Sequence, residues 1–273
     1  MNNSLKIVTV IQARTGSSRL PNKILLPLAG APLLYRMFER VAASKLSGTI
    51  VIATTTDNSD DKVVDICNQY GIKFYRGHQT DLLDRHYQTA KLFNADAVVK
   101  IPSDCPLIDP DVIDEVINYF IIHSDKYDYV SNLHPATFPD GNDVEIMSIN
   151  ALEIAWSKAI NELEREHTTP YLWENPEIFR IGNVIWKTGL DYSMSYRFTI
   201  DYEKDYNFIK QVYDELYPIN RIFSLQNILD LLDRKPELRK INSEYCGVNW
   251  YRNHLNELKT ITAKQTKIID EKR

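Results

Sequence analysis

The chain has 273 residues, of which 44% are hydrophobic and 25% charged, so it is a folded globular protein and not an intrinsically disordered one. Its formal net charge of −5 argues against a protein that binds nucleic acid through bulk positive charge, and no run of about 20 apolar residues is present to span a membrane. Three cysteines without a CxxC pair indicate a reducing compartment. We therefore expect a cytoplasmic protein that has neither nucleic acid nor membrane as a partner.

The first half of the chain alternates short apolar runs with helical segments. Strands are predicted at residues 6–11, 49–53, 72–75 and 97–101, and helices at 33–46, 59–70, 81–94 and from Pro110 onward. Strands that alternate with helices form βαβ units. The predicted fold class is therefore α/β, with a mostly parallel central sheet and helices on both of its faces.

The alternation becomes less regular near Tyr129, where a smaller α+β region is expected. Strands are predicted at 144–147, 179–186 and 196–200, and helices at 150–161, 203–216 and 225–234. We expect three parts: a nucleotide-binding core (1–132), a substrate-binding and dimerisation region that returns a strand to the core (133–217), and a helical extension (218–273).

The loop after the first predicted strand carries the clearest chemical signal. Arg14, Arg19 and Lys23 place three cations in this loop, while Gly16 permits close backbone approach to a ligand and Ser17 adds hydrogen-bond donors. Open α/β sheets bind ligands at the carboxyl ends of their strands, so the loop is suited to wrapping the phosphates of a nucleotide. A solvated basic loop is the alternative. Neither GxGxxG nor GxxxxGK[ST] occurs, which disfavours dinucleotide and Walker-type sites.

Two aspartates from distant parts of the chain also follow predicted strands. Asp104 comes shortly after the strand at 97–101, and Asp201 ends the strand at 196–200. Carboxylates at strand ends can converge over one sheet, and a carboxylate pair suits Mg²⁺ in phosphate chemistry. The alternative is that both aspartates only initiate turns or helices.

Residues 12–23, with the sequence QARTGSSRLPNK, resemble the nucleotide-binding signature of the cytidylyltransferase superfamily. That group includes the 3-deoxy-manno-octulosonate and acylneuraminate cytidylyltransferases. Further motifs that resemble the family follow in order at residues 76–85, 103–109, 138–145, 164–171 and 197–201. The resemblance spans about residues 5–217 and is strongest to the branch of spore-coat polysaccharide biosynthesis enzymes.

The resemblance implies transfer of CMP from CTP to a sugar acid or related surface-glycan precursor, with release of pyrophosphate. It implies Mg²⁺ as cofactor, held by Asp104 and Asp201, with Arg14, Arg19 and Lys23 as the catalytic cations. A homodimer is also expected from the family.

Eight residues are predicted to contact the nucleotide: Gln12, Ala13, Gly16, Ser17, Asn22, Thr54, Asp84 and Arg85. Side-chain amides such as that of Gln12 offer both a donor and an acceptor to a base edge. Asp84 and Arg85 share a helical face with Asp81, so these three side chains either orient the base or ribose or pair with one another.

The acceptor substrate is expected to bind residues from the second half of the chain, namely Asp143, Glu145, Glu166 and His167. Asp143 and Glu145 alternate on a predicted strand and so point the same way. Glu166 and His167 are expected to open a helix, where His167 either serves the substrate or pairs with Glu164.

Two other functions remain open. A nucleotide-sugar glycosyltransferase would need a DxD motif, for which Asp109 and Asp111 are the only candidates, although Pro110 between them favours the charged start of a helix. A non-catalytic nucleotide-binding protein of the same fold is the second alternative. Cys105 is not expected to be a nucleophile, because it lies between an acidic residue and a proline. The other histidines are expected to be surface or packing residues: His78, His86, His123, His134 and His254.

Overall fold

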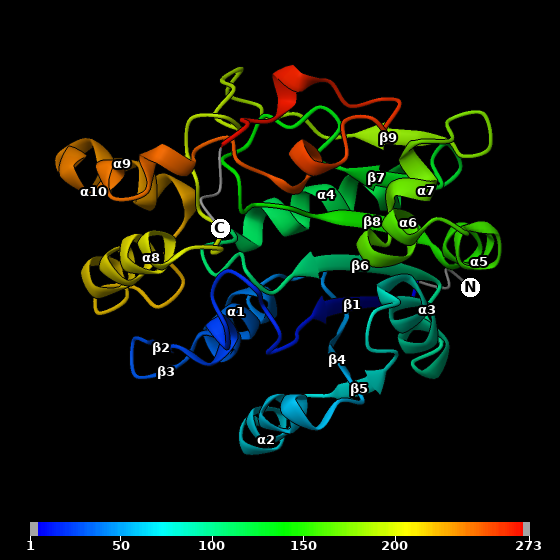
Figure 1. Ribbon diagram of the computed structural model, residues 1–273, viewed down its shortest axis with the longest axis horizontal. Coiled ribbons are helices and arrows are strands. Elements are labelled where there is room, and N and C mark those ends of the chain that lie inside the picture. The colour runs from blue at the N-terminus through cyan, green and yellow to red at the C-terminus, as the bar shows by residue number, and fades with distance from the viewer. Residues whose placement is uncertain (1–4, 270–273) are drawn as a thin grey trace.

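The computed structural model describes residues 5–269 and is built around one seven-stranded sheet (Figure 1). The strand order is β5-β4-β1-β6-β8-β7-β9. The strands are β1 (Ile7–Gln12), β4 (Thr49–Thr55), β5 (Phe74–Gly77), β6 (Ala97–Pro102), β7 (Tyr129–Ser131), β8 (Glu145–Ser148) and β9 (Ile181–Asn183). Strands β5, β4, β1 and β6 are parallel, as are β7 and β9, and only β8 runs against its neighbours. The predicted mostly parallel sheet is confirmed.

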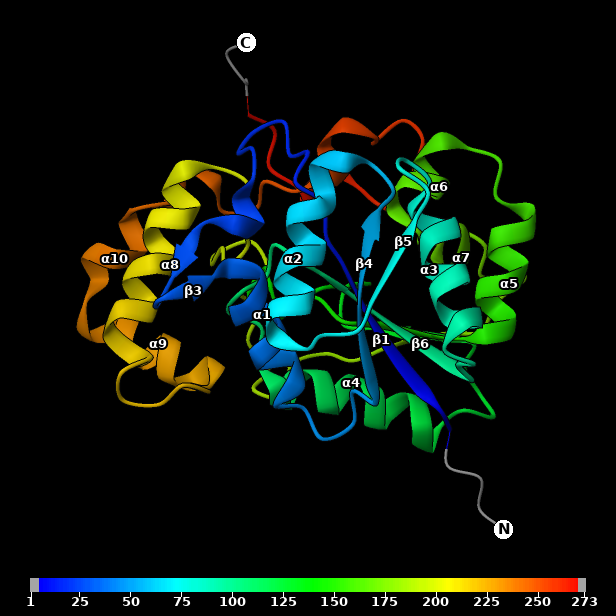
Figure 2. The same cartoon turned by 90° about the horizontal axis from the view of Figure 1, so that it is seen from below.

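Helices pack on both faces of this sheet (Figure 2). One face carries α1 (Leu33–Ala42), α2 (Asp61–Tyr70) and α4 (Pro110–Ile122). Helices α8 (Glu203–Leu216), α9 (Leu225–Arg234) and α10 (Pro236–Lys240) extend the same hydrophobic core to one side of α1. The other carries α3 (Leu82–Leu92), α5 (Ile149–Lys158), α6 (Glu162–His167) and α7 (Pro170–Trp173). A hydrophobic core lies on each face of the sheet, and strand β1 contributes to both because its side chains alternate. Ile7 and Ile11 pack on the first face, and Val8 and Val10 pack on the second.

Local capping signals correctly predicted several helix boundaries. Pro110 opens α4 behind the capping side chain of Asp109, and Ser224 caps α9. Helix α8 has the predicted bounds, and Gly71 ends α2 in the left-handed conformation, with a φ of 65°.

The predicted strand at 196–200 is wrong. This segment joins the sheet at no point and forms only an isolated bridge to Asp140. Its backbone N–H groups bind loops instead, with Phe198 donating to the carbonyl of Asp140 and Ile200 to that of Asp104. The segment therefore passes between two loops at the end of the sheet, where it positions Asp201.

Other boundaries differ for local reasons. Helix α1 stops at Ala42, not residue 46, because Ser44 and the next two backbone N–H groups bind the carboxylate of Asp114. The strand predicted at 72–75 lies at 74–77, since the N–H of Ile72 still closes the end of α2. The strand predicted at 179–186 is only β9. Strand β7 was not predicted, because its three residues carry too short a pattern.

The chain order places a topological switch beside β1. From β5 at one edge, the chain returns past β4 and β1 to form β6 on the other side of β1. Ligands of open α/β sheets bind at the carboxyl ends of the strands where the order reverses. The ends of β1 and β6 are therefore where a site is expected. Within residues 5–269, no helix is both long enough and apolar enough to cross a bilayer.

Candidate active site

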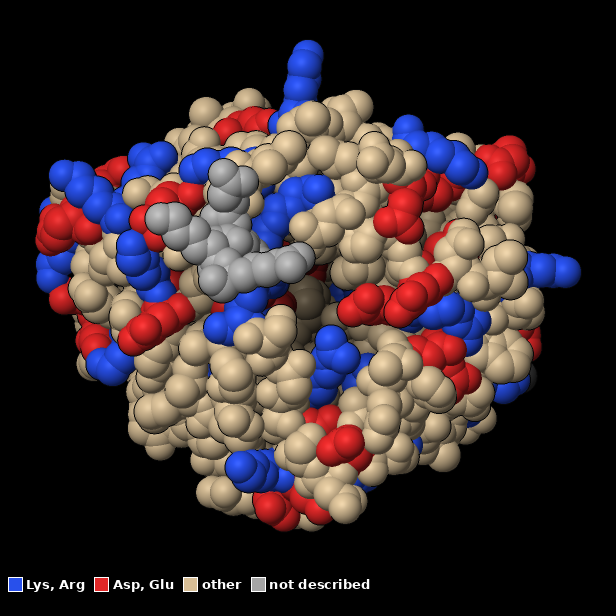
Figure 3. All heavy atoms as spheres, viewed as in Figure 1, with Lys and Arg blue, Asp and Glu red and all other residues tan. Residues whose placement is uncertain are grey.

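A cavity of about 820 Å³ opens at the carboxyl ends of β1 and β6. Figure 3, drawn from the same side as Figure 1, shows a hollow near the middle of the molecule with basic and acidic side chains around it. Cavities that enclose small-molecule ligands typically measure ~300–1,000 Å³. Fourteen of the seventeen predicted site residues line this cavity: Gln12, Ala13, Arg14, Gly16, Ser17, Arg19, Lys23, Arg85, Asp104, Asp143, Glu145, Glu166, His167 and Asp201.

The other three predicted residues do not line the cavity. The Asp84 carboxylate accepts hydrogen bonds from Trp156 Nε1 (2.8 Å) and Gln88 Nε2 (3.0 Å), so it joins α3 to α5. Thr54 is buried within β4, and Asn22 is exposed just before the short 3₁₀ helix η1 (Lys23–Leu25). The positions of these three side chains do not support direct nucleotide contact.

The basic loop after β1 is anchored by a buried carboxylate. Asp60 is 2% exposed, and its Oδ1 accepts hydrogen bonds from the backbone N–H (2.7 Å) and the hydroxyl (2.8 Å) of Thr15. Its other oxygen accepts from the hydroxyl of Thr55 on β4. A Cβ atom at Gly16 would meet nothing within 4 Å, so this part of the loop faces open space. Sequence reasoning missed Asp60, which resembles any helix-start aspartate.

Lys23 joins the two aspartates that were predicted to hold a metal. Its Nζ lies 2.9 Å from Asp104 Oδ2 and 3.3 Å from Asp201 Oδ1, and it also donates to the carbonyl of Ile200 (2.5 Å). Burial opposes the charge of Lys23, but the two carboxylates raise the pKa of this lysine above its usual value. The first loop and the two distant acids therefore meet in one cleft.

Asp201 is held by three cations. Arg19 contacts its Oδ1 (2.7 Å) together with Lys23, and Arg197 contacts its Oδ2 (2.9 Å). Burial favours the neutral acid, yet Lys23, Arg19 and Arg197 lower the pKa of Asp201 below its usual value. The carboxylate is thus kept ionised and ready to hold a cation.

The donor chemistry of this pair fits a divalent cation. Asp104 and Asp201 already share one positive charge, and carboxylate oxygens are the ligands that Mg²⁺ prefers. Across residues 5–269, no group of three or more His, Cys, Asp or Glu side chains is placed to bind a metal. The protein would supply two carboxylates, and phosphate and water oxygens would supply the rest.

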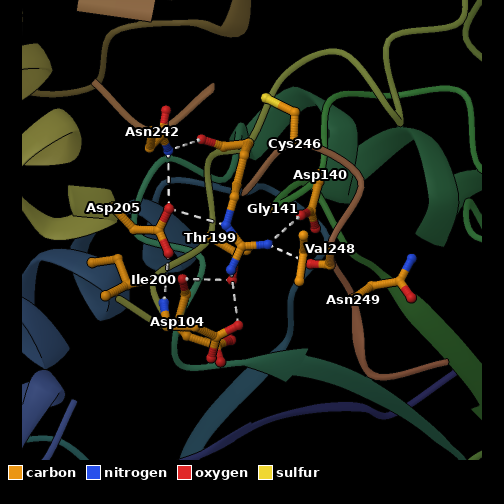
Figure 4. Close-up of polar contacts among 12 residues, drawn as sticks. Asp104, Asp140, Gly141, Thr199, Ile200, Asp205, Asn242, Cys246, Val248 and Asn249 are labelled. Atoms are coloured by element: carbon orange, nitrogen blue, oxygen red, sulfur yellow. Dashed lines mark hydrogen bonds and ion pairs between the residues drawn. The ribbon is translucent and has the colours of Figure 1, made fainter. Parts of the chain in front are cut away.

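Arg197 positions Asp201 by donating from Nη2 to its Oδ2 (2.9 Å), and Figure 4 labels the other partners of this arginine: Asp140, Asp205 and Val248. Its side chain is 0% exposed, and its Nε also donates to Asp205 Oδ1 (3.0 Å). Its Nη1 donates to Asp140 Oδ2 (3.4 Å) and to the carbonyl of Val248 (2.5 Å). Burial opposes its charge, but the three surrounding carboxylates raise the pKa of Arg197.

Two residues that line the cavity, Gln12 and Arg85, each have a buried polar atom without a hydrogen-bond partner in the part of the chain that the structure describes. Arg85 is 3% exposed, and its Nε has no hydrogen-bond partner among residues 5–269; the same holds for the Oε1 of Gln12. The predicted pairing within this helical face does not form, because Asp81 binds Arg165 (2.8 and 2.5 Å) and Asp84 binds Trp156. Burial lowers the pKa of Arg85 to about 10. Unpaired buried polar atoms are costly, so their presence beside a cavity indicates a ligand.

Lys100 and Glu145, which also line the cavity, form an ion pair. They face each other in the register of β6 and β8, and Glu145 also accepts from the hydroxyl of Tyr129 (2.6 Å). Burial favours protonation, but Lys100 lowers the pKa of Glu145 below its usual value. Sequence reasoning missed Lys100, although a lone charge inside an apolar strand was a signal for it.

Asp143 is a further carboxylate that lines the cavity. Its carboxylate accepts a hydrogen bond from the backbone N–H of Gly141 (3.2 Å). Burial raises the pKa of Asp143 to about 6 against the effect of that hydrogen bond, and the charge of Asp104 raises it further.

His167 does not open a helix, as was predicted, but ends α6. Glu164 binds the backbone N–H of Asn161 in a capping box, so the predicted pairing with His167 is absent. The His167 ring instead stacks on Trp250, with 3.9 Å between ring centroids and 11° between planes. Burial lowers the pKa of His167 to about 3, so the ring is neutral near pH 7. Glu166, one residue earlier, reaches across the cavity mouth to Arg14 (4.0 Å).

A further wall comes from the C-terminal part of the chain. We call residues 247–251, 253–254 and 264–265 the C-terminal wall, because all of them line the cavity. His254 belongs to this wall, and His134 lines the cavity while stacked on Trp173 (4.3 Å). Sequence reasoning assigned neither histidine to the site, because nothing local in the sequence marks a residue that reaches a site through tertiary packing.

The DxD candidate does not belong to the cavity. Asp109 accepts from the N–H of Asp111 (2.8 Å) as the cap of α4, and its second oxygen accepts from the N–H of Leu225. Neither aspartate lines the cavity, which confirms the helix-start interpretation. Cys105 is buried, and burial raises the pKa of its thiol well above the usual value, as expected of a cysteine that is not a nucleophile.

Comparison with known proteins shows which proteins this chain resembles. A family model described as cytidylyltransferase matches residues 8–231. An uncharacterised protein of Methanocaldococcus jannaschii, MJ1063, is 36% identical over 244 residues, which are 88% of this chain and 95% of that protein. The spore coat polysaccharide biosynthesis protein SpsF of Bacillus subtilis is 30% identical over 236 residues, covering 85% of this chain and 95% of SpsF. The solved structure of a cytidylyltransferase from Leptospira borgpetersenii is 34% identical with a TM-score of 0.81, covering 86% of this chain and 97% of that one.

Proposed function

Because the chain belongs to the cytidylyltransferase family, we propose that it transfers CMP from CTP to a sugar acid or a related surface-glycan precursor and releases pyrophosphate. The resemblance of its motifs to octulosonate and acylneuraminate cytidylyltransferases supports an acidic sugar as acceptor. The name of SpsF, a spore coat polysaccharide biosynthesis protein, supports a product destined for a surface glycan.

The observation that carries this proposal is the meeting of Lys23 with Asp104 and Asp201 in one cavity. The hydroxyl oxygen of the acceptor attacks the α-phosphorus of CTP and loses its proton to solvent, the bond to the bridging oxygen breaks, and pyrophosphate leaves with the electron pair. Arg14, Arg19 and Lys23 stabilise the charge that builds up on the leaving phosphates. No covalent enzyme intermediate is needed, so positioning and electrostatics account for the catalysis.

We assign Mg²⁺ as the cofactor, held by Asp104 and Asp201. When bound, it would neutralise negative charge on the phosphates of CTP. Arg197 keeps Asp201 ionised and oriented through its charge and fixed geometry.

We assign the cytosine and ribose to the half of the cavity that contains Gln12 and Arg85. A guanidinium donates to the carbonyl and ring-nitrogen acceptors of cytosine, and an amide oxygen accepts from its exocyclic amine. The acceptor then occupies the other half, between Asp143, His167 and the C-terminal wall. We place the reaction in the cytoplasm, in keeping with three unpaired cysteines, and expect a homodimer as in related enzymes.

Pyrophosphate release from CTP, with Mg²⁺ and a panel of sugar acids, tests the proposal. Removing one preorganised electrostatic contact typically lowers the rate by about 10²–10³. Arg14→Ala and Asp104→Asn should therefore abolish measurable turnover without unfolding the protein, while Arg221→Ala, an exposed control, should not. Near-normal release by both active-site variants would contradict the proposed roles. Release of UDP or GDP from nucleotide sugars would instead show a glycosyltransferase.

A further inference from the structure

Lys23 is bound as a metal ion would be. Its Nζ touches three oxygens: Asp104 Oδ2 at 2.9 Å, Asp201 Oδ1 at 3.3 Å and the carbonyl of Ile200 at 2.5 Å. A lysine ammonium has three donors, so these contacts use all of them. The side chain is only 11% exposed. In this state Lys23 has no donor to offer a phosphate.

Both carboxylate oxygens of Asp201 are also in contact with cations. Its Oδ1 accepts from both Lys23 and Arg19, while its Oδ2 accepts from Arg197. Arg197 is fully buried and fixed at four points, whereas Lys23 reaches Asp201 from the first residue of η1. Lysine has a long, flexible stem and compact charge, so among these cations Lys23 is the one suited to move.

A divalent metal and the Lys23 ammonium cannot share this place. Mg²⁺ bonds to oxygen at about 2.0–2.1 Å, so a metal between Asp104 and Asp201 would lie against the Lys23 nitrogen, with like charges in contact. One cation has to leave before the other binds. A triphosphate is the ligand that could receive the displaced ammonium.

We propose that Lys23 is an internal cation that occupies the metal position in the nucleotide-free protein and moves onto the triphosphate when CTP and metal bind. This inference rests on the proposed function for the identity of the nucleotide. It follows that the free protein binds divalent metal weakly, and that metal and CTP bind cooperatively. Linkage requires the effect to be reciprocal, with each ligand tightening the other by the same factor.

Mn²⁺ binding without nucleotide tests the exchange directly. Mn²⁺ takes the same oxygen ligands as Mg²⁺, and its free concentration can be read by electron paramagnetic resonance. Lys23→Gln is expected to bind Mn²⁺ about tenfold or more tightly than the wild type, within the range of known coupling energies. Lys23→Arg keeps the charge and should bind no more tightly than the wild type. Lys62→Gln, an exposed lysine on α2, is the matched control and should also equal the wild type.

A double variant and a calorimetric measurement separate the role of Lys23 from the identity of the nucleotide. Adding Asp201→Asn to Lys23→Gln should abolish the gained Mn²⁺ binding, which locates the metal. Calorimetry should show wild-type CTP binding about tenfold tighter with Mn²⁺ than without it. Failure of CTP to bind at all would contradict the proposed function, while the nucleotide-free Mn²⁺ comparison would still decide the role of Lys23. Nucleotide-free Mn²⁺ binding by the wild type as tight as in the presence of CTP would overturn the inference, even if Lys23→Gln did not fold.

Discussion

Arg197 donates a hydrogen bond from Nη1 to the carbonyl oxygen of Val248, 2.5 Å away and 51 residues later in the chain. The family model ends at residue 231, so this bond connects the family core to a segment beyond it. Asn242 strengthens the connection by donating to the carbonyl of Arg197 and to Asp205. The C-terminal part of this chain therefore both lines the cavity and supports the carboxylate network beneath Asp201.

Arg197→Met should destabilise the protein strongly. Removing one partner from a buried ionic network leaves uncompensated carboxylates and typically costs about 3–5 kcal/mol. Urea unfolding of this variant should therefore have a clearly lower midpoint. The urea midpoint of Arg197→Lys should lie between those of Arg197→Met and the wild type, because lysine keeps the positive charge but lacks the planar guanidinium that binds several acceptors at once. If Arg197→Met unfolded at the same urea concentration as the exposed control Arg221→Met, the network would not contribute to stability.

Arg85→Met should separate ligand binding from stability. Arg85 is buried with its Nε unpaired among the described residues, so an apolar side chain of similar length should leave the melting temperature unchanged or raise it. The affinity for CTP should fall, because a hydrogen bond to a charged group is worth about 1.5–3 kcal/mol, or roughly 10- to 150-fold in Kd. Thermal shift and calorimetry measure the two effects. A lower melting temperature with unchanged CTP affinity would show that Arg85 is structural.

Asp60→Ala should weaken CTP binding from outside the cavity. Without this carboxylate, the N–H and hydroxyl of Thr15 lose their acceptor, and the basic loop loses its anchor to β4. An unsatisfied buried group costs about 1–3 kcal/mol, so stability should fall together with CTP affinity. Hydrogen exchange should also speed up in residues 13–20. Asp65→Ala, at an exposed position on α2, should leave all three measurements unchanged, and equal results for the two variants would refute the anchoring role.

His86 should make the protein sensitive to acid. Burial lowers the pKa of this fully buried histidine to about 3, whereas an unfolded histidine titrates near 6.5. The unfolded state therefore takes up the proton first, and the contribution to stability present above pH 6.5 is lost as the pH falls toward 3. Linkage gives a loss of about 2 kcal/mol between pH 8 and pH 5 from this residue alone.

His86→Phe should reduce that acid-induced loss of stability, measured by urea unfolding at the two pH values. Burial also lowers the pKa of His167 to about 3 and that of His134 to about 4, so part of the loss will remain. His78→Phe, at an exposed position, is the control. An equal pH dependence in wild type and His86→Phe would contradict the assignment.

Features encoded over a few consecutive residues could be predicted from the sequence. Local pattern and capping chemistry predict the apolar run of β1, the helix start at Pro110, the cap at Ser224 and the bounds of α8. The cations of the first loop and the two aspartates could be predicted as well, because motifs in family order carry them. The strand predicted at 196–200 is wrong because local pattern was its only basis. The residues of this segment favour a strand, but its backbone hydrogen bonds go to loops that are distant in the sequence.

Only the tertiary structure decided which of these groups meet. It placed Lys23 between Asp104 and Asp201, left Arg85 without the partners its own helix offered, and brought the C-terminal wall against the cavity. Such contacts join residues up to 178 positions apart. Their energy depends on burial and on the direction of approach, and both properties arise only when the sheet and its helices are packed together.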